Sequence, residues 1–145
     1  MGFDMRTVAA FAVVSALFAA TPAMAQVVNF TAKLNGAAET PPNDSKGTGE
    51  AHVTLDTVNR KVSWTVTYAG LTGPATAAHF HGPAAEGSAA PVAVPLTSPL
   101  ASPVKGSATI SDVQVGNLRA GMWYVNVHTA AHPAGEIRGQ LSEIH

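Results

Sequence analysis

The chain has 145 residues, of which 46% are hydrophobic and 12% charged, and its formal net charge is −1 at pH 7. This length is typical of about one domain, and a near-neutral chain without a Lys or Arg patch argues against nucleic acid or an anionic membrane surface as a partner. The chain has no cysteine. It must therefore fold without disulfides, and a metal site would need His, Met or carboxylate ligands.

The first 25 residues have the features of a secretory signal peptide. Arg6 precedes an apolar run from Val8 to Ala20, and Ala23-Met24-Ala25 has the small-x-small form that signal peptidase cuts. The apolar run is shorter than the about 20 residues that a membrane-spanning helix needs, and no later stretch is long and apolar enough. We expect cleavage before Gln26 and a secreted or periplasmic mature protein with no membrane span.

Several short segments of the remaining chain alternate between apolar and polar residues. Successive side chains of a strand point to opposite faces, so this alternation predicts half-buried strands. The clearest is Val62 to Tyr68, whose apolar face also carries Trp64. Segments rich in Gly, Pro, Asn and Ser separate the strands. The predicted strands are residues 28–34, 51–56, 62–68, 76–81, 92–96, 106–110, 122–129 and 135–144.

No stretch of ten or more residues after the signal peptide keeps a helical period of 3.6. Ser111 to Gly121 is interpreted as a connection that contributes a few apolar contacts. Short strands separated by turn signals are typical of all-β proteins. We therefore predict an all-β fold, an antiparallel β-sandwich of seven or eight strands.

Two segments carry most of the histidines. In Ala78-His79-Phe80-His81-Gly82 the H-x-H spacing puts both imidazoles on one face of a strand and Phe80 on the other. Tyr124 to His132 adds His128 and His132, which would complete a metal clamp if the two strands were neighbours. The alternative is that these are surface histidines on polar strand faces. His52, on another strand, is interpreted as a solvated side chain.

Four ordered motifs resemble the CHRD domain, the module named after chordin that also occurs singly in bacterial secreted proteins. The resemblance covers nearly all of the predicted mature chain and assigns residues 26–145 to one CHRD domain. It implies a fold and a family pattern more than an established reaction. The motifs are Leu34-Asn35-Gly36-Ala37-Ala38-Glu39-Thr40-Pro41-Pro42, Tyr68-Ala69-Gly70-Leu71-Thr72, Ala78-His79-Phe80-His81-Gly82-Pro83, and Tyr124-Val125-Asn126-Val127-His128-Thr129 with His132 to Leu141.

A second resemblance is to Cu/Zn superoxide dismutase, which is also an immunoglobulin-like β-sandwich. That family holds copper with an H-x-H pair and a further His from a late strand, and His79, His81 and His128 are similar in type and order. The resemblance would place Arg138 where the dismutase keeps its anion-guiding arginine. This chain lacks the cysteines of the structural disulfide and a comparable zinc loop.

These observations predict a metal site of His79, His81 and His128, because imidazole nitrogen suits copper and zinc. His132 is either a fourth ligand, an outer partner or a loop residue. Asn126 is expected to support a ligand imidazole by hydrogen bonding. Glu136 either does the same or forms a structural polar pair with Arg138.

The predicted function is that of a secreted protein that binds one copper ion, with zinc as the alternative metal, for copper handling or superoxide-type redox chemistry. The alternative is a non-catalytic extracytoplasmic module that recognises a protein or glycan. The residues leave open whether the protein is an enzyme. A hydrolase is disfavoured, because the chain has no G-x-S-x-G motif.

Overall fold

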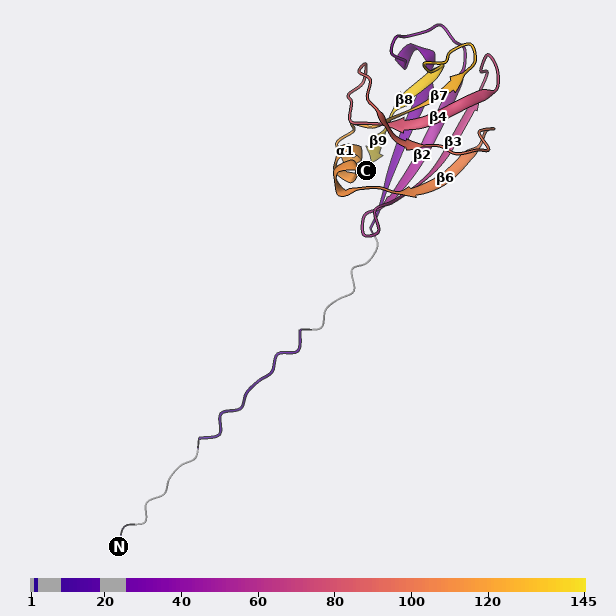
Figure 1. Cartoon of the computed structure of the whole chain (residues 1–145). Helices are drawn as coiled ribbons and strands as arrows, with labels where there is room; N and C mark the ends of the chain where they lie inside the picture. Colours follow the sequence, from indigo (N-terminus) through magenta and orange to yellow (C-terminus); the bar gives the residue numbers. More distant parts are fainter. Residues whose placement is uncertain (1, 3–8, 19–25) are drawn as a thin grey trace.

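The computed structural model describes residues 2, 9–18 and 26–145. Most of the predicted signal peptide, and its cleavage motif Ala23-Met24-Ala25, lie outside the described residues. Residues 9–18 form neither helix nor strand, and Figure 1 shows them extended away from the folded part. None of the helices within the described ranges is long and apolar enough to cross a membrane.

The folded part is an antiparallel β-structure, as the alternation predicted (Figure 1). Within the described residues it has nine strands, joined in the order β5-β4-β7-β8-β1-β2-β3-β6, with β9 paired to β1. The sheet curves back on itself, so that β4, β7 and β8 cross the part formed by β1, β2 and β3. The strands are Val27–Asn35 (β1), Thr48–Asp56 (β2), Lys61–Ala69 (β3), Ala75–His81 (β4), Val92–Pro95 (β5), Val104–Thr109 (β6), Tyr124–Thr129 (β7), Ile137–Gln140 (β8) and Ser142–Ile144 (β9).

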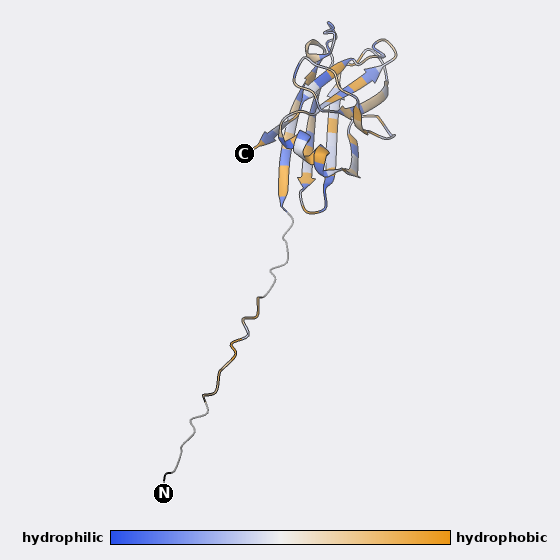
Figure 2. Cartoon of the chain, turned by 60° about the vertical axis from the view of Figure 1, so that its left-hand side comes forward, coloured by the Kyte–Doolittle hydropathy of each residue, from blue (hydrophilic) through white to orange (hydrophobic). Residues whose placement is uncertain are grey.

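The core lies between these two halves of the curved sheet. Apolar residues alternate with polar ones along the long strands, so each strand turns one face inward (Figure 2). Trp64 of β3 meets Phe80 of β4 edge to face with ring centroids 5.3 Å apart, and Phe80 also packs near Trp123. These rings join the two halves, and they fix the inward face of β4 on the side away from His79 and His81.

The last predicted strand, residues 135–144, is two strands in the structure. Leu141, between them, is buried, and its amide donates to the carbonyl of Trp123. The segment is therefore divided at Leu141 into β8 and β9. β8 pairs with β7 and with the end of β1 at Asn35, whereas β9 pairs with β1 at residues 29–31. This break accounts for a strand count above the predicted seven or eight.

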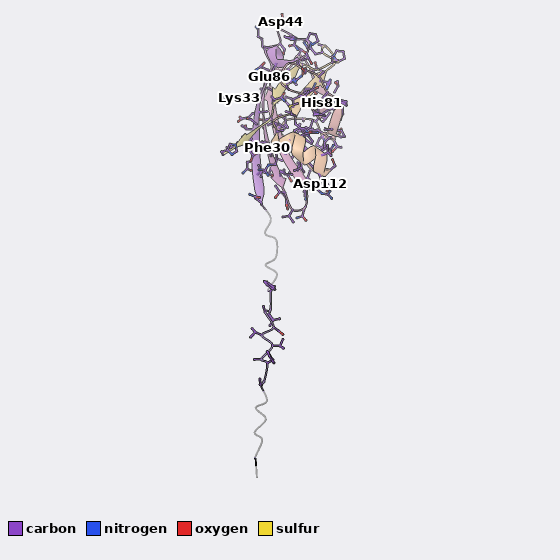
Figure 3. The ribbon with its side chains drawn as sticks, turned by 90° about the vertical axis from the view of Figure 1, so that its left-hand side faces the viewer. Phe30, Lys33, Asp44, His81, Glu86 and Asp112 are labelled. Carbon is purple, nitrogen blue, oxygen red and sulfur yellow. The ribbon has the colours of Figure 1, made fainter. Side chains whose placement is uncertain are left out.

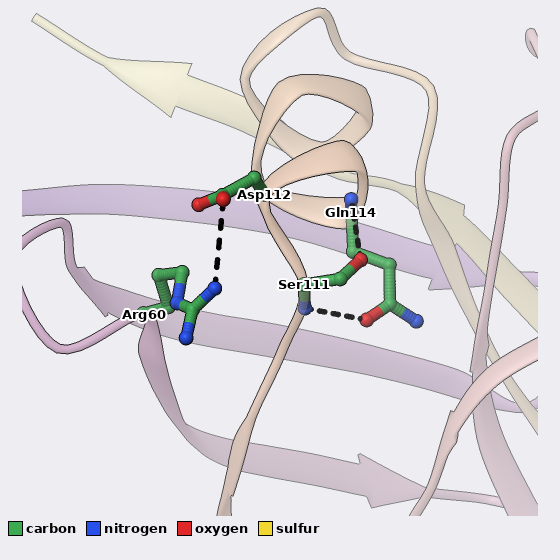
Figure 4. A network of polar contacts seen from close by, with 4 residues as sticks. All are labelled: Arg60, Ser111, Asp112 and Gln114. Atoms are coloured by element: carbon green, nitrogen blue, oxygen red, sulfur yellow. Dashed lines mark hydrogen bonds and ion pairs between the residues drawn. The ribbon is translucent and has the colours of Figure 1, made fainter.

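The prediction that Ser111 to Gly121 is only a connection was wrong, because Asp112–Arg119 forms an α-helix, α1. Ser111 and Gln114 form a reciprocal capping box, and Asp112 pairs with Arg60 at 3.5 Å (Figure 4). Only Leu118 of the helix is buried, and a helix with so little buried surface needs no apolar stripe of helical period. The periodicity of the sequence therefore did not indicate a helix here. The capping signal S-x-x-Q was present in the sequence.

A second departure lies in the segment between β1 and β2, which was predicted as a loop. Gly36–Ala38 forms one turn of 3-10 helix, η1, and the side chain of Asn35 caps it by accepting from the amide of Ala38 at 2.9 Å. The chain after η1 brings Glu39 into a buried position next to β8.

Candidate metal centre

The neighbouring strands β4 and β7 bring the two histidine segments together. In their antiparallel register His79 lies opposite Asn126, His81 opposite Tyr124, and Ala77 opposite His128. Side chains opposite each other in a ladder share one face of the sheet. The two strands are therefore neighbours, which is the condition that a shared site of the two segments required. Figure 3 labels His81, on the side of the domain away from Lys33 of β1.

Three imidazoles converge on this face. His79, His81 and His128 each offer a ring nitrogen within 4.8 Å of the others. Among the described residues, these three form the group that could hold a metal ion. Nδ1 of His79 lies 3.1 Å from Nε2 of His128. His132 is not part of this group. Its backbone closes the β7–β8 turn, where its amide and carbonyl bond to those of Thr129.

Backbone carbonyls hold two of the rings by their outer nitrogens. Nδ1 of His81 lies 2.9 Å from the carbonyl oxygen of Ala90, and Nδ1 of His128 lies 2.9 Å from that of Pro133. A carbonyl oxygen only accepts hydrogen bonds, so these two contacts favour the tautomer that carries the proton on Nδ1. The Nε2 of a neutral ring then presents a lone pair, which is the arrangement that fixes a metal-binding histidine.

The sequence of the folded part matches the family model of the CHRD domain over residues 30–141. The chain belongs to the CHRD-domain family. No curated protein and no solved structure matched it. CHRD domains occur in extracellular proteins.

Burial favours the neutral form of two imidazoles of this CHRD domain. It lowers the pKa of His79, and the proximity of His128 and His81 lowers it further. Burial also lowers the pKa of His81, although its hydrogen bonds to Ala90 and Asn126 oppose the effect. Only the neutral ring binds a metal ion.

Two stacked side chains, Tyr124 and Arg138, support His81 from one side. The ring of Tyr124 is parallel to the imidazole, with centroids 4.7 Å apart and an angle of 4° between the planes. The guanidinium of Arg138 lies over the ring of Tyr124, 3.5 Å from its centroid. Arg138 is only 1% exposed and donates to Thr40, Ala85 and Gln140. This stack restricts the orientation of the His81 ring.

Asn126 lies beside the histidines. Its side-chain oxygen is 3.0 Å from Nε2 of His81 and 3.0 Å from Nε2 of His128. Its side-chain nitrogen and the carboxylate of Glu39 both lie next to Gly135, and Glu39 is 4% exposed. Burial raises the pKa of Glu39, opposed by the amide of Thr40 and the side chain of Asn126. A carboxylate thus lies behind the imidazoles.

Glu136 has a different place from the one predicted for a ligand-orienting residue. Its buried carboxylate accepts from Ser45 Oγ at 2.8 Å, from the Thr72 amide at 3.0 Å, from Thr129 Oγ1 at 2.7 Å and from the Thr72 hydroxyl. None of these partners is an imidazole or Arg138. Burial opposes ionisation of Glu136, but these hydrogen bonds outweigh it and lower its pKa to about 2. Glu136 thus connects the loops that carry Ser45 and Thr72 to Thr129, on the strand that carries His128.

Sequence reasoning missed two residues of the site, Tyr124 and Glu39. Tyr124 shares the predicted polar face of its strand with Asn126 and His128, and that position was the available signal. Glu39 lies in a loop 87 positions before Asn126 in the chain. Its available signal was a single acidic residue between Ala38 and Thr40 in the first CHRD motif.

Proposed function

We propose that this CHRD domain binds one copper ion through His79, His81 and His128, and that it serves in copper handling outside the cytoplasm. One observation carries the proposal. The carbonyl oxygens of Ala90 and Pro133 favour the proton on Nδ1 of His81 and His128, which leaves Nε2 as the ligand atom, and the three imidazoles offer ring nitrogens within 4.8 Å of one another. The predicted signal peptide and the occurrence of CHRD domains in extracellular proteins support export.

The choice of copper over zinc rests on ligand chemistry. Sites made of nitrogen and oxygen ligands bind Cu²⁺ more tightly than Zn²⁺. Neutral imidazole suits both metals, so zinc remains the competitor in the experiment. The chain has no cysteine that would add a thiolate ligand.

The surroundings of Arg138 favour copper handling over superoxide chemistry. An arginine that guides an anion to a metal has to face the approaching solute. Arg138 instead is 1% exposed, and its guanidinium is engaged with Tyr124 and with hydrogen-bond acceptors. A structural role, holding Tyr124 against His81, agrees with this burial.

Titration of the mature protein with Cu²⁺ against a competing chelator tests the proposal. We expect one Cu²⁺ per chain. Loss of a residue that only hydrogen-bonds to a ligand typically lowers metal affinity about 10–100-fold, and each of the variants H79A, H81A and H128A should lower it further than that. H52A is the matched control, because His52 is an exposed strand histidine paired with Glu50 at 3.2 Å. Parental affinity in both H79A and H128A would refute a shared site.

A further inference from the structure

Asn126 is placed as a ligand would be, between two imidazoles. Its side chain is 3% exposed and projects from β7 onto the same face as His79, its partner in the ladder. The amide oxygen is 3.0 Å from Nε2 of His81 and also 3.0 Å from Nε2 of His128. One oxygen thus faces two ring nitrogens.

These contacts are unfavourable for neutral rings without a cation. The carbonyl oxygens of Ala90 and Pro133 each face Nδ1 of one ring, and the amide oxygen of Asn126 faces both Nε2 atoms, but a neutral ring has only one N–H to donate. In the tautomer that carries it on Nδ1, each Nε2 presents a lone pair. The lone pairs and the amide oxygen of Asn126 then repel each other. A cation among them converts the same three atoms into favourable ligands.

We propose that the amide oxygen of Asn126 is a fourth donor to the copper ion, which makes the site three-nitrogen and one-oxygen. The inference rests on the proposed function and deepens it. Atoms bound to one ion at about 2.0–2.1 Å are about 2.9 Å apart at a right angle and about 3.3 Å apart at the tetrahedral angle.

The four donors follow one another at such spacings. His79 Nδ1 is 3.1 Å from His128 Nε2, which is 3.0 Å from Asn126 Oδ1, which is 3.0 Å from His81 Nε2. Three consecutive separations near the right-angle value favour a tetragonal arrangement. Tetragonal sites with nitrogen and oxygen ligands are typical of Cu²⁺.

The carboxylate of Glu39 determines which end of the amide faces the histidines. A side chain added at Gly135 would meet both Glu39 Oε1 and Asn126 Nδ2, so these two atoms lie close together behind the site. Glu39 Oε1 is buried, and no hydrogen-bond partner for it exists within the part of the chain that the structure describes. The Asn126 NH₂ group is attracted to this oxygen, which directs the amide oxygen toward the imidazoles.

The competing role for Asn126 is that of a donor, with its NH₂ turned toward the Nε2 atoms. Substitution by aspartate separates the two roles, because an ionised carboxylate supplies an oxygen but no proton. A second carboxylate at this position would repel Glu39, so the informative variant is the double change N126D with E39Q, in which the new glutamine amide can donate to the introduced carboxylate. N126L removes both roles and serves as the comparison.

The deciding measurement is made on the parent protein. Asparagine labelled with ¹³C at the side-chain carbonyl is incorporated, the mature protein is loaded with one equivalent of Cu²⁺, and ¹³C couplings are recorded by electron–nuclear double resonance. We expect a strong coupling from a carbon bonded to a ligand oxygen, and its loss in N126L. Copper affinity should fall about 10–100-fold or more in N126L and remain within about tenfold of the parent in N126D with E39Q.

Two failures are distinguishable. If the parent binds one Cu²⁺ and the three His variants lose it, but the ¹³C coupling is absent, Asn126 is only a neighbour and the further inference is overturned while the proposed function stands. If the parent binds no Cu²⁺, both fall. Urea denaturation of each variant without metal verifies that it is folded before affinities are compared.

Discussion

Replacing Glu136 by Gln should destabilise the domain at neutral pH and leave it almost unaffected at pH 2. The buried carboxylate accepts four hydrogen bonds, from Ser45, from Thr129 and from the amide and hydroxyl of Thr72. Hydrogen bonds to a charged group contribute about 1.5–3 kcal/mol each, and those to a neutral group about 0.5–1.5 kcal/mol. The loss of charge therefore removes about 1 kcal/mol per bond.

Part of that loss is offset, because a neutral amide costs less to bury than a carboxylate. We expect E136Q to lower the free energy of unfolding by about 2–4 kcal/mol at pH 7. The pH dependence follows from the pKa of Glu136, which falls from 4.5 to about 2 on folding. A depressed pKa gives stability that is present above about pH 4.5 and lost as the pH falls toward 2.

Urea denaturation from pH 2 to 7 measures this difference, with the fluorescence of the buried Trp64 and Trp123 as the signal. Other titrating groups are common to both proteins, so the difference between them isolates Glu136. E86Q is the matched control, because Glu86 is exposed. A difference between parent and E136Q that stays constant over this pH range would refute the reasoning.

Three further substitutions test separate parts of the structure. G135A should lower stability by about 1–3 kcal/mol and should also lower copper affinity, because φ is 125° and the new side chain would meet Glu39. In the control G87A, φ is 83° and an added Cβ would meet no atom within 4 Å, so only the backbone cost should remain. Equal effects of the two substitutions in chemical denaturation would contradict this. S111A should cost about 1 kcal/mol through loss of the helix cap while copper affinity stays parental, and a change in affinity would count against the independence of α1 from the site. H132A should bind copper within about tenfold of the parent, because His132 lies outside the three-histidine group; a larger loss in the titration would make it a ligand.

Local pattern was sufficient to predict the strand type and the faces of the histidines. The H-x-H spacing placed His79 and His81 together and Phe80 in the core, as the structure has them. The pairing of β4 with β7 could not be derived in this way, because register between distant strands is set by tertiary packing. The involvement of His128 came instead from its order along the chain and from the family resemblance.

The remaining features of the site depend on contacts that no local pattern contains. Glu39 reaches Asn126 only because η1 turns the chain back toward β8. The stack of Arg138 on Tyr124 requires the register of β7 with β8, in which Tyr124 lies opposite Gln140 and Asn126 opposite Arg138. Such cross-strand neighbours become visible only once the sheet order is known.

The metal content of the native protein tests the central claim most directly. The full chain is exported to the periplasm in copper-supplemented medium, purified without a His tag or chelator, and analysed for copper and zinc by mass spectrometry, with a variant lacking His79, His81 and His128 prepared in parallel. We predict about one copper per parent chain and none in the triple variant. Parent protein without copper, or equal copper in both proteins, would contradict a copper site at these three histidines.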